Sequence, residues 1–208
     1  MGIGKFFSDA AKLLVMGVGV SDSGTIPRKL DLAKIATGED WRLTNSSASV
    51  VEFKGKEAVQ FDARQGEGWA IYDGLELSAG KIDISIAAIR QQVGLVIRAH
   101  SESEREIVIF EIDADATTDR PALTVRFGQQ STVVEVPPRL VDEWLTARVV
   151  VAREFTAVFL NNSNTPSLKV PTETPDTVGG KIGFWIGDHS QALVADLKYL
   201  QSRKRDFE

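Results

Sequence analysis

The run Glu111-Ile112-Asp113-Ala114-Asp115 carries carboxylates at every second position. Successive side chains of a β-strand point to opposite faces, so these three carboxylates would share one face of a sheet. Two carboxyl groups about 5–5.5 Å apart are what a retaining glycoside hydrolase requires. Glu111, Asp113 and Asp115 are therefore candidate catalytic residues, although a solvated polar strand face explains the same spacing without catalysis.

The acidic run continues to Asp119 and includes Thr117 and Thr118. Hard cations such as Ca²⁺ bind six to eight oxygen ligands, so Asp113, Asp115 and Asp119 are candidate calcium ligands. The run lacks the glycine and the bidentate glutamate of a true calcium loop, which favours a simple acidic turn. We accordingly expect no cofactor, with Ca²⁺ as the alternative.

Arg98 and His100 lie before the acidic run, at alternate positions of an apolar stretch. If the loop 101–104 closes a symmetric hairpin, His100 lies opposite Arg105. Arg98 and His100 then share a face with Glu111 and Asp113. An arginine beside carboxylates lowers their pKa and orients them, which suits hydrogen bonding to sugar hydroxyls. A lattice of ion pairs on a solvated sheet fits the pattern equally well. On the binding interpretation, Arg98→Ala and Glu111→Gln should weaken ligand binding without unfolding the protein.

Three aromatic residues lie in glycine-flanked stretches, where a ring could pack against the face of a sugar. Trp69 and Tyr72 are predicted to line the rim of a binding site, and Trp185 is either a core residue or part of the lining. The complete predicted ligand site comprises Arg98, His100, Glu111, Asp113, Trp69, Tyr72 and Trp185.

Alternating apolar and polar residues dominate from about Thr25 onward, and Gly, Pro and Asn residues interrupt them at regular intervals. This pattern is typical of short strands in a β-sandwich and leaves little room for long helices. In the run 179–187, glycines allow close backbone approach and Trp185 fills the space that they leave. The predicted strands are Ser49–Phe53, Ala58–Asp62, Gly68–Tyr72, Gly80–Ala88, Gly94–His100, Arg105–Asp113, Ala122–Phe127, Thr132–Val136, Leu145–Ala152, Thr156–Leu160, Lys181–Ile186 and Ala192–Leu200.

The first 24 residues differ from the remainder, so we divide the chain into segment 1–24 and one domain over residues 25–208. Lys5 and Lys12 precede a short apolar stretch containing Gly17 and Gly19, which is the pattern of a secretory signal peptide. An amphipathic N-terminal helix explains the same residues. The protein would be periplasmic or extracellular in the first case and cytoplasmic in the second.

The composition argues against several classes of function. The 208 residues carry a net charge of −5 and include no cysteine, so the sequence excludes disulfides and thiolate chemistry. Clustered Lys and Arg residues bind nucleic acid phosphates, and the one basic run is Arg203-Lys204-Arg205, so no nucleic acid partner is expected. No apolar stretch reaches the ~18 residues that a membrane span requires.

From Phe61 to the C-terminal end, the sequence resembles the concanavalin A-like lectin/glucanase superfamily, especially its laminin-G-like and 3-keto-disaccharide hydrolase-type domains. The resemblance implies a jelly roll of two curved antiparallel sheets, with any ligand on the concave face or its rim loops. In laminarinase-like relatives, the corresponding motif would make Glu111 the nucleophile, Asp113 its tuning residue and Asp115 a shortened acid/base. The matching stretches are Gly66–Ala70, Asp73–Leu77, Gly80–Ile86, Gly94–Ala99, Glu143–Val149, Val158–Asn161 and Gly180–Lys198.

Pattern and resemblance together predict an all-β fold, a two-sheet antiparallel jelly-roll sandwich, with a short N-terminal helix or signal-like segment before it. Because one fold hosts many functions, the function must come from the site. We expect a non-catalytic carbohydrate-binding or cell-envelope recognition module. One alternative is a glycoside hydrolase, of 3-keto-glycoside or laminarinase-like type, acting through concave-face carboxylates. The second is a structural or protein-interaction domain without a small ligand.

Overall fold

The computed structural model describes residues 26–101, 105–112, 122–135, 143–171 and 179–202. The predictions for segment 1–24 and for the basic run 203–205 lie outside these ranges. No helix within them has the length and apolar character needed to cross a bilayer. The described elements are β1 (Arg28–Lys29), α2 (Ala33–Thr37), β2 (Trp41–Thr44), β3 (Ser47–Phe53), β4 (Lys56–Asp62), β5 (Gly68–Leu77), β6 (Gly80–Ala99), β7 (Arg105–Ile112), β8 (Ala122–Phe127), β9 (Gln130–Glu135), β10 (Leu145–Val151), β11 (Phe155–Leu160), β12 (Leu168–Pro171), β13 (Gly180–Ile186) and β14 (Gln191–Gln201).

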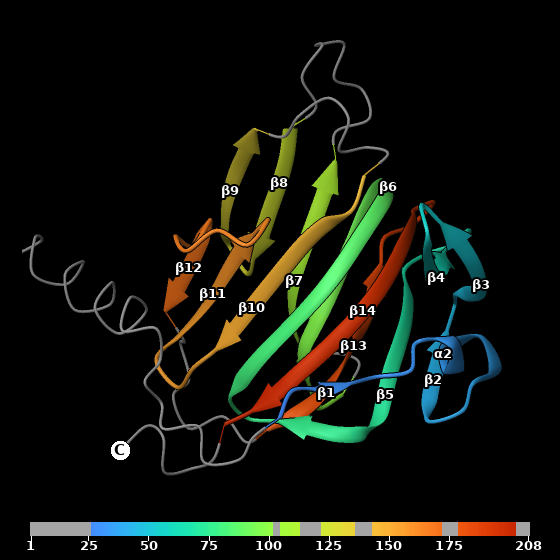
Figure 1. The fold of residues 1–208 in the computed structure, drawn as a ribbon, viewed down its shortest axis with the longest axis horizontal. Coiled ribbons are helices and arrows are strands. Elements are labelled where there is room, and N and C mark those ends of the chain that lie inside the picture. Colours follow the sequence, from blue (N-terminus) through green and yellow to red (C-terminus); the bar gives the residue numbers. More distant parts are fainter. Residues whose placement is uncertain (1–25, 102–104, 113–121, 136–142, 172–178, 203–208) are drawn as a thin grey trace, which may run out of the picture.

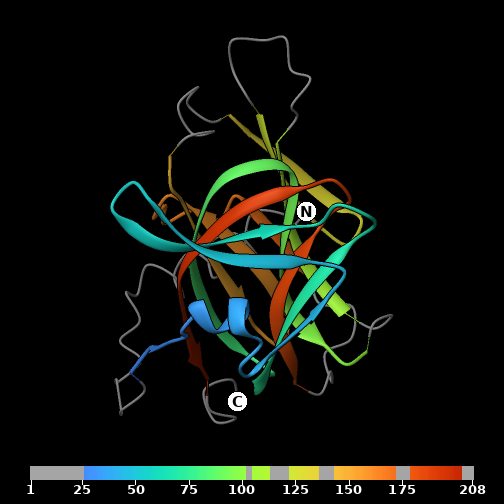
Figure 2. The ribbon, with the colours of Figure 1, turned by 90° about the vertical axis from the view of Figure 1, so that its right-hand side faces the viewer.

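The strands form two antiparallel sheets that share β6 (Figure 1). Sheet A has the order β12-β11-β10-β6-β14-β4-β3, with β1 also paired to β14. Sheet B has the order β2-β5-β13-β6-β7-β8-β9. Figure 2 shows α2 and the β3–β4 hairpin together on one side of the molecule. The predicted all-β jelly-roll sandwich is confirmed.

The prediction of two separate strands, Gly80–Ala88 and Gly94–His100, is wrong, because β6 runs unbroken through both. Its first part pairs with β10 in sheet A, and its second part pairs with β7 in sheet B. The residues between the two predicted strands, 89–93, include neither glycine nor proline, so nothing there favours a turn. Instead, left-handed backbone at Ala88 (φ 46°) and Gln91 (φ 67°) bends the strand as it passes between sheets.

The main core lies between the sheets and follows the predicted alternation. On β7, Val108, Phe110 and Ile112 point into it, and on β13 the alternate residues, including Phe184, do the same. The Phe184 ring stacks on Trp41 of β2 with centroids 5.9 Å apart. Full burial of one such side chain contributes about 1.5–3 kcal/mol. Sequence reasoning did not predict β1, β2, β12 or the short helix α2.

The predicted register of the β6–β7 hairpin is wrong. Arg105 lies opposite Ala99 rather than His100, and Glu106 lies opposite Arg98. The register shifts between Val96 and Arg98, where a β-bulge adds one residue to β6. A bulge changes which residues face one another beyond it, so the predicted alignment of Arg98 and His100 with the carboxylates does not hold.

Candidate functional site

A second apolar layer covers the outer face of sheet B, opposite the main core. Trp69 on β5, Val96 on β6 and Trp185 on β13 form its centre. Side chains on alternate positions of a strand point to opposite faces, so these residues are separated by the sheet from the main core. We call this group the tryptophan layer. The partly buried residues Ile71, Ala99, Ile107 and Ile109 pack against it.

The two indoles of the tryptophan layer lie side by side. On β13, Trp185 is directly opposite Trp69 of β5 and directly opposite Gly94 of β6. The ring centroids are 6.2 Å apart, and the planes are tilted by 52°. A Cβ at Gly94 would lie 2.5 Å from Ile107 Cγ2 and 3.1 Å from Trp185 Cε3, so glycine leaves room for the indole. Trp185 is therefore a buried residue of this second apolar cluster, as its core alternative predicted, and it lies on the outer side of sheet B rather than in the main core.

A charged pair covers the tryptophan layer. The Arg105 guanidinium lies 3.4 Å from the centre of the Trp69 ring, within the range of a cation–π contact. Glu67 Oε2 accepts a hydrogen bond of 3.1 Å from Trp185 Nε1 and lies 3.8 Å from Arg105 Nη2. Trp69 and Trp185 are only 9% and 5% exposed. A sugar ring can pack on the covered face of Trp69 only if the guanidinium moves aside.

Glu111 lies on the outer face of sheet B, on β7, two residues beyond Ile109 of the tryptophan layer. It is opposite Gln92 on β6 and Thr124 on β8, and its Oε1 accepts a hydrogen bond of 2.8 Å from Gln92 Nε2. The carboxylate is half-buried and bound to a neutral amide. These groups can exchange hydrogen bonds with ligand hydroxyls. Asp113, the second carboxylate of the predicted pair, lies outside the described residues.

A second charged group lies at the β2 side of the same sheet. Asp73 Oδ1 accepts hydrogen bonds from Lys181 and, at 2.6 Å, from Arg42 Nη2. The Lys181 hydrogen bond, followed by that of Arg42, lowers the pKa of the Asp73 carboxyl below its usual value. Asp73 is thus a carboxylate at neutral pH, held between two cations. Sequence reasoning missed this group because its members come from three separate strands.

Arg98 is not on an open binding surface. Its side chain is buried, with the residue 2% exposed, and Nε and Nη2 donate to Glu106 Oε2 at 3.0 and 2.6 Å. Gln92, which faces Glu111, is six residues away on β6. At ~3.3 Å per residue, this places Arg98 roughly 20 Å along the strand from Glu111. His100 follows the end of β6 and is exposed. The structure therefore does not bring Arg98 and Glu111 together.

Tyr72 lies on the opposite face of β5 from Trp69, so the two do not line one surface. Its ring packs against Trp41 with centroids 5.1 Å apart, and it contacts the main core. Burial is the main cause that raises the pKa of the Tyr72 phenol. Within the described ranges, no group of three or more His, Cys, Asp or Glu side chains could hold a metal ion. The candidate calcium ligands Asp113, Asp115 and Asp119 lie outside those ranges.

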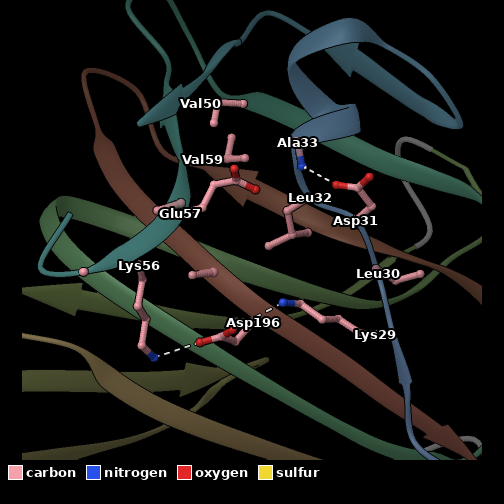
Figure 3. A pocket seen from close by; sticks show the side chains of 13 residues that line it. Lys29, Leu30, Asp31, Leu32, Ala33, Val50, Lys56, Glu57, Val59 and Asp196 are labelled. Carbon is pink, nitrogen blue, oxygen red and sulfur yellow. Dashed lines mark hydrogen bonds and ion pairs between the residues drawn. The ribbon is translucent and has the colours of Figure 1, made fainter. Parts of the chain in front are cut away.

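A groove of about 520 Å³ lies on the other side of the molecule, at sheet A (Figure 3). It opens where the start of β4 separates from β14, and the segment from β1 to α2 forms its other wall. Lys56 Nζ donates to Asp196 Oδ2 at 2.8 Å, and Lys29 Nζ lies 3.7 Å from Oδ1. Figure 3 shows both lysines reaching Asp196 from opposite sides. The remaining lining residues are Leu30, Asp31, Leu32, Ala33, Val50, Gly55, Glu57, Ala58, Val59 and Ala195.

Asp196 makes a pH-dependent contribution to stability. Its hydrogen bond from Lys56 is the main cause that lowers the pKa of its carboxyl. The stabilisation is therefore fully present above the unfolded pKa of about 3.9 and is lost as pH falls through the lower folded-state pKa. More than a third of the side chain is exposed, so we expect less than about 1 kcal/mol.

Urea unfolding between neutral pH and about pH 2 measures this contribution. Asp196→Asn should be less stable than the wild type at neutral pH, and the difference should shrink on acidification. A difference that stays constant across this range would show that the Asp196 charge does not contribute.

No protein-family model and no curated protein matches the sequence. Solved structures match in fold. A protein of unknown function with a galectin-like fold from Bacillus subtilis has a TM-score of 0.57 at 11% identity, over 86% of this chain and 100% of that chain. The Bacillus licheniformis β-glucanase has a TM-score of 0.52 at 11% identity, over 87% of this chain and 94% of that one.

The Crh5 transglycosylase in complex with NAG has a TM-score of 0.57 at 10% identity, over 86% of each chain. These structures share the galectin-like, concanavalin A-like jelly-roll architecture with the present chain. At identities of 10–11%, the similarity establishes the fold alone.

Proposed function

We propose that this protein is a non-catalytic carbohydrate-binding module and that its ligand lies on the outer face of sheet B. The observation that carries the proposal is the tryptophan layer, in which Glu67 orients one indole and Arg105 stacks on the other. When the Arg105 guanidinium moves aside, the Trp69 ring can supply apolar contact to a sugar ring, while the charged and amide groups beside it hydrogen-bond the sugar hydroxyls. The glucanase and transglycosylase names of two similar folds agree with this substrate class.

The polar groups around the tryptophan layer supply both hydrogen-bond donors and acceptors. Gln92 and Glu111 lie toward one end of the face, and Asp73 with its two cations lies on the β2 side. Among the predicted polar ligand residues, Glu111 lies on the same face of sheet B as the tryptophan layer. We also propose that the chain is a member of the concanavalin A-like lectin/glucanase superfamily, in its group of laminin-G-like and 3-keto-disaccharide hydrolase-type domains.

A glycan-array screen of the full chain, followed by calorimetric titration of the best ligand, tests the proposal. We expect Glu111→Gln to weaken binding by about tenfold, because hydrogen bonds to a charged acceptor contribute roughly 1.5–3 kcal/mol. Glu57→Gln is the matched control, since Glu57 is exposed in the groove of sheet A. An array without any bound glycan, or binding that Glu57→Gln weakens and Glu111→Gln does not, would contradict the proposal.

The burial of both indoles favours a second candidate function, a protein-interaction domain without a small ligand. In that case the tryptophan layer acts as a small second core. Glu67 and Arg105 then stay in contact with its indoles and no sugar reaches them. The same screen separates the two functions. Glycan binding accompanied by a change in tryptophan fluorescence supports the carbohydrate-binding module, whereas no response in either measurement supports the interaction domain.

A further inference from the structure

One row of directly opposite residues crosses sheet B from the tryptophan layer to the edge strand β9, which Figure 1 shows beyond β8 at one side of the sandwich. In order across β13, β6, β7, β8 and β9, the row contains Trp185, Gly94, Ile109, Arg126 and Ser131. Val125 and Phe127, the neighbours of Arg126 along β8, face the main core. Arg126 therefore lies on the outer face, the same face as the tryptophan layer.

Arg126 is a half-buried arginine without a counter-charge. Arg42 and Lys181, on the same face, share Asp73 as their counter-ion. Within the described residues, by contrast, the Arg126 side chain forms no ion pair, hydrogen bond or ring contact. Partial burial of a charge costs free energy unless the charge is paired, so the guanidinium gains an interaction when an anion from outside the chain binds it.

The neighbours of Arg126 leave its donors available. Glu111 lies opposite Thr124 and so occupies the diagonal position to Arg126, within reach of a long side chain. Its carboxylate nevertheless accepts a hydrogen bond from Gln92 and forms no ion pair with Arg126 within the described structure. Ser131, directly opposite Arg126 on β9, is exposed and has a hydroxyl donor. Arg126 and Ser131 together therefore offer donors to an anion on the β9 side of the face.

We propose that the glycan bound by the outer face of sheet B is acidic, and that Arg126 binds the carboxylate of one of its uronic acid units. This inference rests on the proposed function and specifies the ligand class of that site. The planar guanidinium can donate two parallel N–H bonds to the two oxygens of a carboxylate, whereas a neutral glycan would leave its charge unpaired.

The position of Arg126 in the row also sets the size of the ligand. Arg126 lies three strands from Trp185, and neighbouring strands are 4.7–4.9 Å apart, which places the two residues roughly 14 Å from each other across the sheet. A single sugar ring does not span this distance. The ligand is therefore an oligosaccharide that extends across the strands from the tryptophan layer to β8.

The first test compares acidic glycans with the same glycans after their charge has been removed. Calorimetric titration of the full chain uses short oligomers of polygalacturonate, alginate and hyaluronate, each beside its methyl ester, which keeps the rings and hydroxyls but is neutral. We expect at least one acid to bind about tenfold more tightly than its ester, because hydrogen bonds to a charged group contribute roughly 1.5–3 kcal/mol. Raising the salt concentration should reduce this preference.

The outcomes of this titration separate the inference from the proposed function. Equal binding of acid and ester, or binding of neutral or sulfated glycans alone, would overturn the uronate inference and leave the carbohydrate-binding module standing. Binding of an acidic peptide such as hexaglutamate without any glycan would overturn both and assign the face to a protein partner. Failure of every glycan to bind would likewise overturn both.

The second test removes the guanidinium. Arg126→Gln should weaken binding of the acid by about tenfold or more and leave the ester unaffected, so the ratio of the two affinities approaches one. Arg126→Lys keeps the charge without the bidentate geometry and should give an intermediate ratio. Urea unfolding of both variants should match the wild type, because the Arg126 side chain has no ion pair to lose.

Arg148→Gln is the matched control for the loss of one positive charge. Arg148 belongs to sheet A, where its Nε donates to Asp83 at 2.6 Å, and its side chain is 43% exposed. This variant should keep the acid-to-ester ratio of the wild type. An unchanged ratio in Arg126→Gln, or an equal fall in both variants, would overturn the role of Arg126.

Discussion

Arg98→Ala is expected to destabilise the protein by about 3 kcal/mol, because the guanidinium is buried and paired with Glu106. Removing one partner of a buried ion pair leaves the other without its counter-charge. Glu106 is partly exposed and can regain some hydration, so the lower end of the usual 3–5 kcal/mol range applies. This result differs from the sequence-based expectation that Arg98→Ala weakens ligand binding without affecting the fold.

Urea unfolding of Arg98→Ala measures the loss, and Arg42→Ala is the matched control. Arg42 also belongs to sheet B and pairs with Asp73, but its side chain is mostly exposed. Exposed ion pairs typically contribute about 0–1 kcal/mol, so the control should lose much less stability. If Arg98→Ala is as stable as the wild type and instead loses glycan affinity, the structural role assigned to Arg98 is wrong.

Gly183→Ala should destabilise the protein by about 3 kcal/mol or more, through steric conflict within sheet B. A Cβ at Gly183 would lie 2.2 Å from the backbone oxygen of Ala70 and 3.0 Å from Ile71 Cα on the adjacent strand. Backbone atoms cannot move aside as a flexible side chain can. The β5–β13 ladder, whose register already shifts between Lys181 and Gly183, would have to separate.

Gly128→Ala provides the comparison for this prediction. Gly128 lies in the β8–β9 turn with φ 58°, and no atom lies within 4 Å of a Cβ placed there. An L-residue in left-handed backbone costs roughly 1–2 kcal/mol, so this variant should lose less stability than Gly183→Ala. Thermal or urea unfolding of both variants gives the ranking. A smaller loss for Gly183→Ala would show that the strands around it separate easily.

The amino-acid sequence by itself determined the fold class and much of the main core. Alternation along β7 placed Val108, Phe110 and Ile112 on one face, because the strand period of two follows from local backbone geometry. The Asn161-Asn162 turn after β11 was also predictable, since asparagine tolerates the left-handed backbone found at both positions. These features depend on neighbouring residues in the chain.

The tertiary structure alone decided which polar and aromatic residues share a surface. The bulge in β6 moved Arg98 opposite Glu106, and the order β5-β13-β6 brought Trp69 and Trp185 together. The groove at Asp196 likewise arises where β4 separates from β14. Strand order, register and bulges are set by packing across the whole sandwich. An alternating pattern therefore gives the face of a residue, but its partners across the sheet come from distant parts of the chain.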